Sequence, residues 1–219
     1  WLRRTAMTDT IETYMDLAPV MAVVTIADVA QAVPMAKALV AGGCTTIEVT
    51  LRTPVALDAM RAIADAVPEA VIGAGTVLTA KDLENSAKAG AKFAISPGAT
   101  PALLAMGRDG AIPYLPAVAT ASELMAGLEH GYRAFKFFPA VAAGGVAMLK
   151  SFGGPFPYVR FCPTGGVTLE TAPDFLKLPN VACVGGSWLT PDAAMKDGDW
   201  GKIQTLAQAA TDALAAFKA

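Results

Sequence analysis

The stretch Ala134-Phe135-Lys136-Phe137-Phe138-Pro139-Ala140 reads as a short apolar strand with one lysine near its centre. A charged lysine among phenylalanines is costly, because burial disfavours the ionised form. Such a lysine is usually paired with an acid or kept neutral for use as a nucleophile. The alternative is an edge-strand lysine whose stem packs while its ammonium reaches water. The segments on either side must decide among these hypotheses.

Around this stretch, apolar strands alternate with helical patterns in eight units of roughly 20 to 25 residues. We expect the strands at 19–26, 45–51, 71–77, 93–96, 112–118, 134–140, 160–163 and 181–184. We expect the helices at 8–17, 29–41, 54–66, 80–89, 101–108, 121–129, 146–152, 169–176 and 200–217. Alternation of this kind predicts an α/β fold with a parallel sheet, and eight units favour a TIM (β/α)8 barrel with an extra N-terminal helix. The alternative is an open doubly wound sheet.

Composition favours a single globular domain. The chain has 219 residues, 54% of them hydrophobic and 16% charged, with a formal net charge of −2. We interpret residues 7–219 as one barrel domain and residues 1–6, ahead of Met7, as a cloning or upstream remnant. The charge balance gives no basic footprint for nucleic acid, and no apolar run is long enough for a membrane span.

Cysteine and histidine usage narrows the chemistry. Cys44, Cys162 and Cys183 are odd in number and widely spaced, which is typical of reduced core thiols in a cytoplasmic protein. His130 is the only histidine. A single histidine argues against a histidine-ligated metal site and against Ser-His-Asp catalysis, so we expect no metal.

The second predicted strand carries polar side chains on one face. Because side chains alternate along a strand, Glu48, Thr50 and Arg52 share the face that would point into a barrel. A structural ion pair is one interpretation. The functional interpretation gives Glu48 a role in proton transfer and lets Arg52 grip a carboxylate with two hydrogen bonds.

Other candidate site residues also follow strands. The third strand ends in Gly73-Ala74-Gly75-Thr76, and the fourth ends in Ser96-Pro97-Gly98. Gly165-Gly166 and Gly185-Gly186 follow the last two strands, where TIM barrels commonly bind phosphate through backbone N–H groups. Polar residues at the carboxyl ends of the strands favour the barrel over the open sheet.

A strand lysine, a strand acid, a rim arginine and a phosphate cradle together indicate a class I aldolase. In that chemistry a lysine amine attacks a ketone, and the resulting imine withdraws electrons from the bond to be cleaved.

Six motifs in order resemble the 2-keto-3-deoxy-6-phosphogluconate (KDPG) and 4-hydroxy-2-oxoglutarate aldolase family. They are Glu48-Val49-Thr50-Leu51-Arg52, Gly73-Ala74-Gly75-Thr76-Val77, Ile95-Ser96-Pro97-Gly98, Phe135-Lys136-Phe137-Phe138-Pro139, Arg160-Phe161-Cys162-Pro163-Thr164-Gly165-Gly166 and Val184-Gly185-Gly186-Ser187-Trp188. The resemblance covers residues 20–200 and implies a cytoplasmic, homotrimeric TIM-barrel lyase of the Entner–Doudoroff pathway. It also implies a phosphorylated keto-acid substrate and no cofactor.

The resemblance implies a role for each matching residue. Lys136 would form the Schiff base, and Glu48 would accept and donate protons. The pyruvate carboxylate would be held by Arg52 and Thr76, with Pro97 nearby. Phe138 would line the imine pocket, and Thr164 would contact the aldehyde portion. The phosphate would be bound by Gly165, Gly166, Gly186 and Ser187.

Two positions depart from the family pattern. Pro116-Ala117 stands where the family usually has Pro-Gly, and Val141 stands where it usually has Glu. Both positions bear on substrate breadth rather than on imine chemistry. Three other hypotheses remain: an aldolase for unphosphorylated 4-hydroxy-2-oxoglutarate, a phosphate-handling isomerase or epimerase, and a trimeric scaffold or assembly building block with incidental aldolase activity.

Overall fold

A computed structural model describes residues 10–217 of the chain. Its strands are β1 Val20–Val24, β2 Thr46–Thr50, β3 Val71–Gly75, β4 Phe93–Ile95, β5 Tyr114–Leu115, β6 Ala117–Val118, β7 Ala134–Phe137, β8 Arg160–Pro163 and β9 Val184–Gly186. All pair in parallel, in the orders β5-β4-β3-β2-β1-β9 and β6-β7-β8. Parallel bridges from Phe161 to Val181 and from Thr164 to Gly185 join β8 to the segment containing β9, which closes the barrel.

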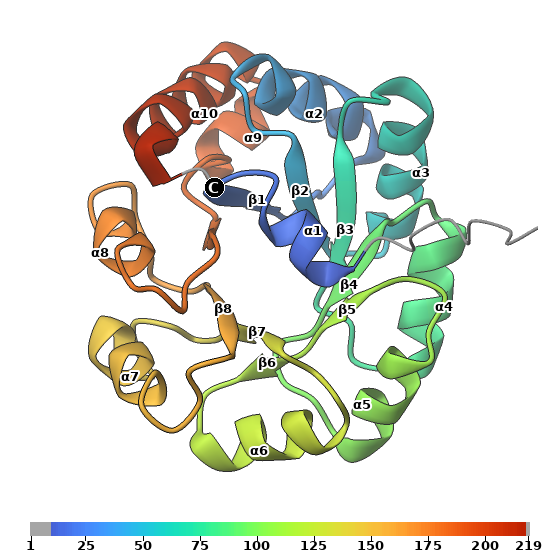
Figure 1. The fold of residues 1–219 in the computed structure, drawn as a ribbon. Helices are drawn as coiled ribbons and strands as arrows, with labels where there is room; N and C mark the ends of the chain where they lie inside the picture. Colours follow the sequence, from blue (N-terminus) through green and yellow to red (C-terminus); the bar gives the residue numbers. More distant parts are fainter. Residues whose placement is uncertain (1–9, 218–219) are drawn as a thin grey trace, which may run out of the picture.

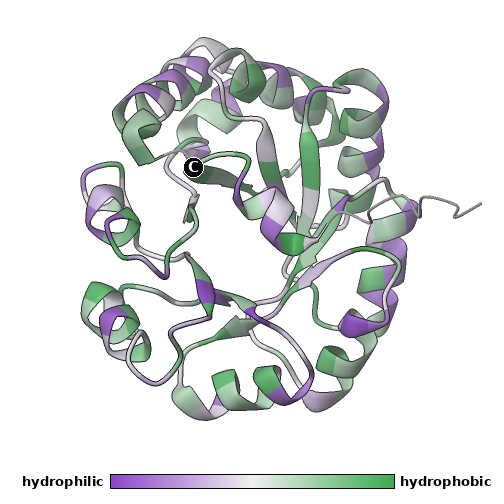
Figure 2. Ribbon diagram, viewed as in Figure 1, coloured by the Kyte–Doolittle hydropathy of each residue, from purple (hydrophilic) through white to green (hydrophobic). Residues whose placement is uncertain are grey.

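Helices surround this barrel as a ring (Figure 1). They are α2 Ala32–Ala41, α3 Ala56–Ala66, α4 Ala80–Lys88, α5 Pro101–Arg108, α6 Ala121–Glu129, α7 Gly145–Phe152, α8 Ala172–Leu176, α9 Asp192–Asp197 and α10 Trp200–Leu214, with short 3₁₀ turns at Val29–Gln31 and Ala215–Phe217. The strands are mostly hydrophobic, and the helices carry most of their hydrophilic residues on the outer side (Figure 2). This is the distribution expected of parallel strands buried on both faces.

Strand alternation divides the apolar residues into two cores. Residues such as Ile47 and Val49 face the helices. The inner core fills the barrel and consists of Ile11, Tyr14, Met15, Met21, Phe93, Ile95, Leu115, Ala134, Cys162 and Cys183. Its first three members belong to α1 Ile11–Met15, which lies across the amino-terminal ends of the strands. The extra N-terminal helix predicted for the barrel is therefore confirmed, and it closes one end of the barrel.

The predicted barrel is confirmed, with local differences that have physical causes. Pro116 lacks an N–H, and the strand predicted at 112–118 is accordingly divided into β5 and β6 around it. The strand predicted at 181–184 is displaced, because β9 begins only at Val184 and Val181 contributes a single bridge. Helix α3 begins after Pro54, and α8 begins at Ala172 with Pro173 in its first turn. Thr120 caps α6, in a capping box with Glu123.

Residues 1–6, for which the sequence predicted a remnant, lie outside the described residues. Within residues 10–217, no helix combines the length and apolar character needed to cross a bilayer.

Candidate active site

The site is built around an ion pair that spans the barrel interior. Lys136 Nζ on β7 donates to Glu48 Oε1 on β2 at 2.9 Å and to Oε2 at 3.2 Å. Three strand positions separate β2 from β7 in either direction around the barrel, so the two side chains meet from opposite walls. Their side chains are only 6% and 2% exposed. The lysine is therefore buried and paired with an acid, and it does not reach water from an edge strand.

Glycines make the space that this contact requires. A Cβ on Gly75 would lie 2.7 Å from Glu48 Cγ and 2.8 Å from its Cδ, distances at which the Glu48 side chain would have to move. Gly75 is the register partner of Thr50 and stands beside the Glu48 carboxylate. Gly185 likewise leaves room for Thr164, because a Cβ there would lie 3.0 Å from Thr164 Cβ. The small residues at these strand ends are thus needed by the polar side chains beside them.

Aromatic and thiol groups border the amine. The ring of Phe138 has its centroid 5.4 Å from Lys136 Nζ, which favours a cation at that point. Cys162 is the register partner of Lys136 and is buried, with its Sγ 3.9 Å from Thr164 Oγ1. A hydrogen bond with the Cys183 thiol is the main influence that lowers the pKa of Cys162, and the positive charge of Lys136 acts in the same direction. Cys162 is therefore a core thiol that also stands directly beside the amine.

The other predicted site residues all lie at the carboxyl ends of strands. Arg52, Thr76 and Pro97 follow β2, β3 and β4, and Thr164 follows β8. Thr76 has φ 58°. This left-handed conformation is strained for a β-branched residue and is typical of functional positions.

The two glycine pairs differ in conformation. Gly165 and Gly166 have φ of 100° and 78°, a backbone that glycine alone adopts readily. Gly186 is buried at the end of β9, and Ser187 follows it at the exposed rim. Both pairs lie at the carboxyl ends of their strands, at the same end of the barrel as Arg52 and Thr76.

A polar cavity of about 320 Å³ lies between the end of β2 and the end of β9. Arg52 and Ser187 both line it, together with Val23, Thr25, Thr190, Pro191 and Asp192. Arg52 therefore borders this cavity. The ion-pair partner of Glu48 is Lys136 and not Arg52. Sequence reasoning missed Thr25 and Asp192. The alternation of β1 could have found Thr25, because Met21, Val23 and Thr25 share one face.

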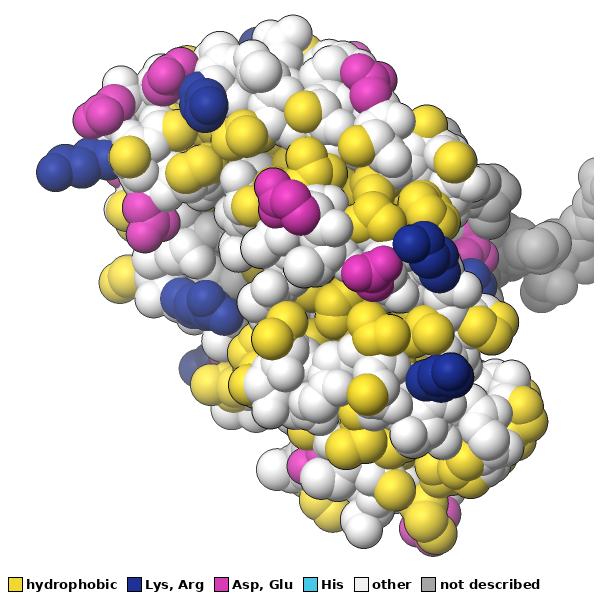
Figure 3. Space-filling model, turned by 90° about the vertical axis from the view of Figure 1, so that its left-hand side faces the viewer, with side chains coloured by type: hydrophobic (Ala, Val, Ile, Leu, Met, Phe, Trp, Pro, Cys, Tyr) yellow, Lys and Arg dark blue, Asp and Glu magenta, His cyan; other side chains and the backbone are white. Residues whose placement is uncertain are grey.

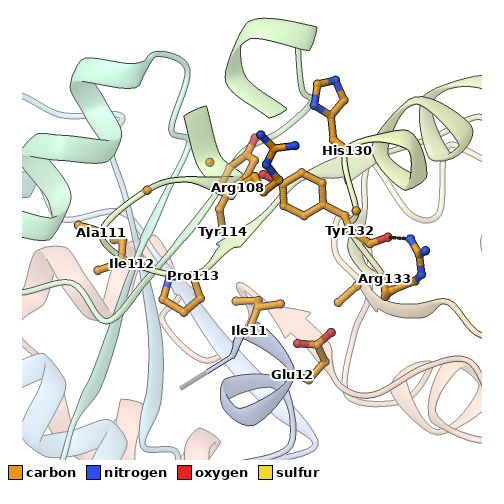
Figure 4. Close-up of a pocket in the computed structure, with 14 residues that line it drawn as sticks. Ile11, Glu12, Arg108, Ala111, Ile112, Pro113, Tyr114, His130, Tyr132 and Arg133 are labelled. Carbon is orange, nitrogen blue, oxygen red and sulfur yellow. Dashed lines mark hydrogen bonds between the residues drawn. The ribbon is translucent and has the colours of Figure 1, made fainter. Parts of the chain in front are cut away.

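A second cavity, of about 410 Å³, lies at the opposite end of the barrel. It is bordered by α1 and by the loops that precede β5 and β7, and Arg108, Tyr132 and Arg133 line it (Figure 4). No predicted site residue is among its lining residues. In the part of the chain that the structure describes, no group of three or more His, Cys, Asp or Glu side chains is placed to hold a metal ion.

Comparison with known proteins identifies the family. The family model described as "KDPG and KHG aldolase" matches residues 11–206. This chain belongs to that aldolase family. It is 55% identical, over 88% of its length and 89% of the relative's, to the 2-dehydro-3-deoxy-phosphogluconate aldolase of Pseudoalteromonas atlantica. It is 51% identical to the KHG/KDPG aldolase of Escherichia coli K12, with 92% of this chain and 94% of the relative covered.

A solved structure of another family member is also similar. The KDPG aldolase of Legionella pneumophila, captured with pyruvate as a covalent carbinolamine intermediate, has a TM-score of 0.89 and 49% identity. The match covers 91% of this chain and 97% of that one. The aldolase family and the barrel predicted from the six motifs are therefore confirmed.

Proposed function

We propose that this protein is a class I aldolase that cleaves KDPG to pyruvate and glyceraldehyde 3-phosphate. The observation that carries the proposal is the buried contact between Lys136 Nζ and the Glu48 carboxylate. The activity named for the similar proteins, and the covalent pyruvate adduct in the Legionella enzyme, support the same chemistry.

In this mechanism the ion pair supplies both the nucleophile and its base. The Lys136 ammonium passes a proton to Glu48, and the free amine adds to the C2 ketone to give a carbinolamine. Glu48 returns the proton to the carbinolamine hydroxyl, which leaves as water, so that an iminium on Lys136 faces a Glu48 carboxylate. Each transfer is short because the nitrogen and the carboxylate start within hydrogen-bond distance.

Cleavage then uses the same carboxylate. Glu48, directly or through a water, takes the proton of the C4 hydroxyl, the C3–C4 bond breaks, and its electrons move to the iminium. Glyceraldehyde 3-phosphate leaves, and an enamine remains on Lys136. Glu48 protonates the enamine carbon, and hydrolysis of the iminium releases pyruvate and restores the ion pair. Acid–base assistance of this kind contributes about 10²- to 10⁴-fold in rate.

The remaining site residues bind the two ends of the substrate. Arg52 and Thr76 hold the carboxylate, with Pro97 beside them, and Phe138 lines the imine pocket. Thr164 contacts the aldehyde portion. Gly165, Gly166, Gly186 and Ser187 bind the phosphate. Support comes from their common location at the carboxyl ends of the strands, where TIM barrels hold their active sites.

Cleavage of 4-hydroxy-2-oxoglutarate is a second activity of the same site. The E. coli relative carries both substrates in its name. The imine chemistry at Lys136 is identical for both keto acids, and relative kcat/KM values on the two substrates measure the preference.

The test combines turnover with trapping of the intermediate. Pyruvate release from KDPG is followed by coupling to lactate dehydrogenase. Borohydride in the presence of pyruvate should add a reduced pyruvyl group to Lys136, detected by peptide mass spectrometry. A Lys136→Met variant serves as the matched control and should give no adduct. An unlabelled Lys136 in the active wild-type protein would overturn the mechanism.

The protein also fits a cytoplasmic homotrimer. Large hydrophobic side chains are exposed on its surface, among them Leu78, Met106 and Met125 at 60%, 45% and 55%. Hydrophobic groups also gather between scattered charges on the flank shown in Figure 3. Cys44, Cys162 and Cys183 are free thiols, in keeping with a reducing compartment. Light scattering coupled to gel filtration tests the trimer, and a monomeric mass would reject it.

A further inference from the structure

Thr25 is a polar residue at the carboxyl end of β1, on the strand face that points into the barrel. Val23, two residues earlier, is the register partner of Glu48, so Thr25 stands one residue pair closer to the rim than the catalytic carboxylate. Strand β1 lies between β2 and β9 in the sheet. Thr25 therefore stands between Arg52, which follows β2, and Ser187, which follows β9, and all three line one cavity of about 320 Å³.

The hydrogen bonds around Thr25 fix the direction of its hydroxyl. Thr50 Oγ1 donates to the backbone oxygen of Val24 at 3.0 Å. Thr50 Oγ1 also lies 2.9 Å from Thr25 Oγ1. A hydroxyl has one proton, and that of Thr50 is already used, so Thr25 must be the donor in the second bond. The Thr25 oxygen is left with acceptor capacity alone.

An acceptor at this point has a consequence for the substrate. The polar lining of the cavity comprises one cation, Arg52, the hydroxyl-bearing residues Ser187 and Thr190, and two groups with acceptor capacity alone, the Thr25 oxygen and the Asp192 carboxylate. Beside Thr25 this lining suits a hydroxyl that donates a hydrogen bond, whereas Arg52 and Ser187 suit the anionic groups of the substrate. The substrate would extend from its carboxylate at Arg52 to its phosphate at Ser187. The carbons that become the aldehyde product would then lie beside β1, which stands between β2 and β9.

We infer that Thr25 is a specificity-determining residue that accepts a hydrogen bond from the hydroxyl next to the aldehyde carbon of that product. This inference rests on the proposed aldolase function and deepens it. The favoured substrates are polyhydroxylated 2-oxo acids, whose aldehyde fragment carries a 2-hydroxyl. Substrates such as 4-hydroxy-2-oxoglutarate, whose fragment is glyoxylate, do not make this bond.

The test uses two acceptor aldehydes that differ only in this hydroxyl. Aldol addition of pyruvate to D-glyceraldehyde and to 3-hydroxypropanal is measured for the wild type and for Thr25→Val, which replaces the hydroxyl by a methyl of similar size. The aldehyde preference is the kcat/KM for D-glyceraldehyde divided by the kcat/KM for 3-hydroxypropanal. This ratio should fall by about 2- to 10-fold in Thr25→Val, the range for the loss of one net hydrogen bond. Thr25→Ser retains the oxygen and should recover the wild-type ratio.

Thr53→Val is the matched control on the same rim. Its hydroxyl donates to the Ile26 backbone oxygen at 2.6 Å, and it does not line this cavity. The inference is overturned if the kcat/KM ratio is unchanged in Thr25→Val, or if it falls equally in Thr53→Val. It is also overturned if the ratio falls in Asp192→Asn but not in Thr25→Val. If the wild type releases pyruvate from KDPG but Thr25→Val has the same kcat/KM ratio as the wild type, only this inference is overturned. A wild-type protein that releases none overturns the proposed function as well.

Discussion

Gly75→Ala should slow the aldolase reaction by displacing the Glu48 carboxylate. An added methyl at Gly75 would lie 2.7 Å from Glu48 Cγ and 2.8 Å from Cδ, and closer still to Oε1, whereas ordinary contact begins at 3.4 Å. Glu48 lies against the β3 backbone on one side and Lys136 on the other, so it has little room to retreat. A shift of roughly 1 Å in a reacting group can cost about 10²-fold in rate, and we expect kcat to fall 10- to 100-fold.

The assay separates placement of the carboxylate from loss of the fold. Lactate-dehydrogenase coupling gives kcat for KDPG, borohydride trapping with pyruvate measures imine formation, and thermal melting reports stability. Trapping should decline less than kcat, because the amine itself is not obstructed. Gly73→Ala is a packing control on the same strand face. Its methyl would meet the Phe93 ring, so the melting temperature should fall more than it does in Gly75→Ala. Gly154→Ala, 3.7 Å from the Ser151 carbonyl oxygen, is the neutral control.

A double-mutant cycle decides whether the effect passes through Glu48. Glu48→Gln removes the carboxylate, so displacing the residue 48 side chain can reduce kcat little further. Gly75→Ala should therefore reduce kcat by a much smaller factor in the Glu48→Gln background than in the wild type. The same fold loss of kcat in both backgrounds would refute the reasoning. An unaltered kcat in Gly75→Ala alone would also refute it.

Three further perturbations test other parts of the structure. Lys136→Met should abolish borohydride trapping and, by leaving Glu48 buried without its cation, lower the free energy of unfolding in urea by about 3–5 kcal/mol; an unchanged urea midpoint would contradict this. Thr76→Gly should relieve the strain of φ 58° and stabilise the protein by about 1 kcal/mol while raising the pyruvate concentration needed for trapping; unchanged trapping would reject the proposed carboxylate contact. Burial raises the pKa of Tyr114 from 10.0 to about 12. The stability that depends on its neutral phenol is therefore complete below pH 10 and is lost as the pH rises toward 12, because the unfolded phenol ionises first. Tyr114→Phe should be less stable than the wild type at pH 8, where it lacks the hydrogen bond to Ser96, and should lose less stability between pH 8 and 11; parallel alkaline losses would argue against this account.

Much of the fold follows from local sequence. The helices at 101–108 and 121–129 were predicted to the residue, because Thr100 and Thr120 cap their starts and Pro101 suits a first helical position. The displaced last strand has no such signal. The glycines at 185 and 186 suggest a turn, yet they pair with Met21 and Ala22 of β1. A glycine at 185 is explained by the Thr164 side chain, which leaves no room for a Cβ there.

The sequence by itself determined the repeating strand and helix pattern, the inward face of Glu48, Thr50 and Arg52, and the lysine in the sixth strand of the barrel. These depend on periodicities of two and 3.6 residues, which are local properties of the chain. Only the tertiary structure decided that Lys136 meets Glu48 while Arg52 lines a cavity with Ser187. Those distances depend on how many strands close the barrel and with what register, and no short segment carries that information.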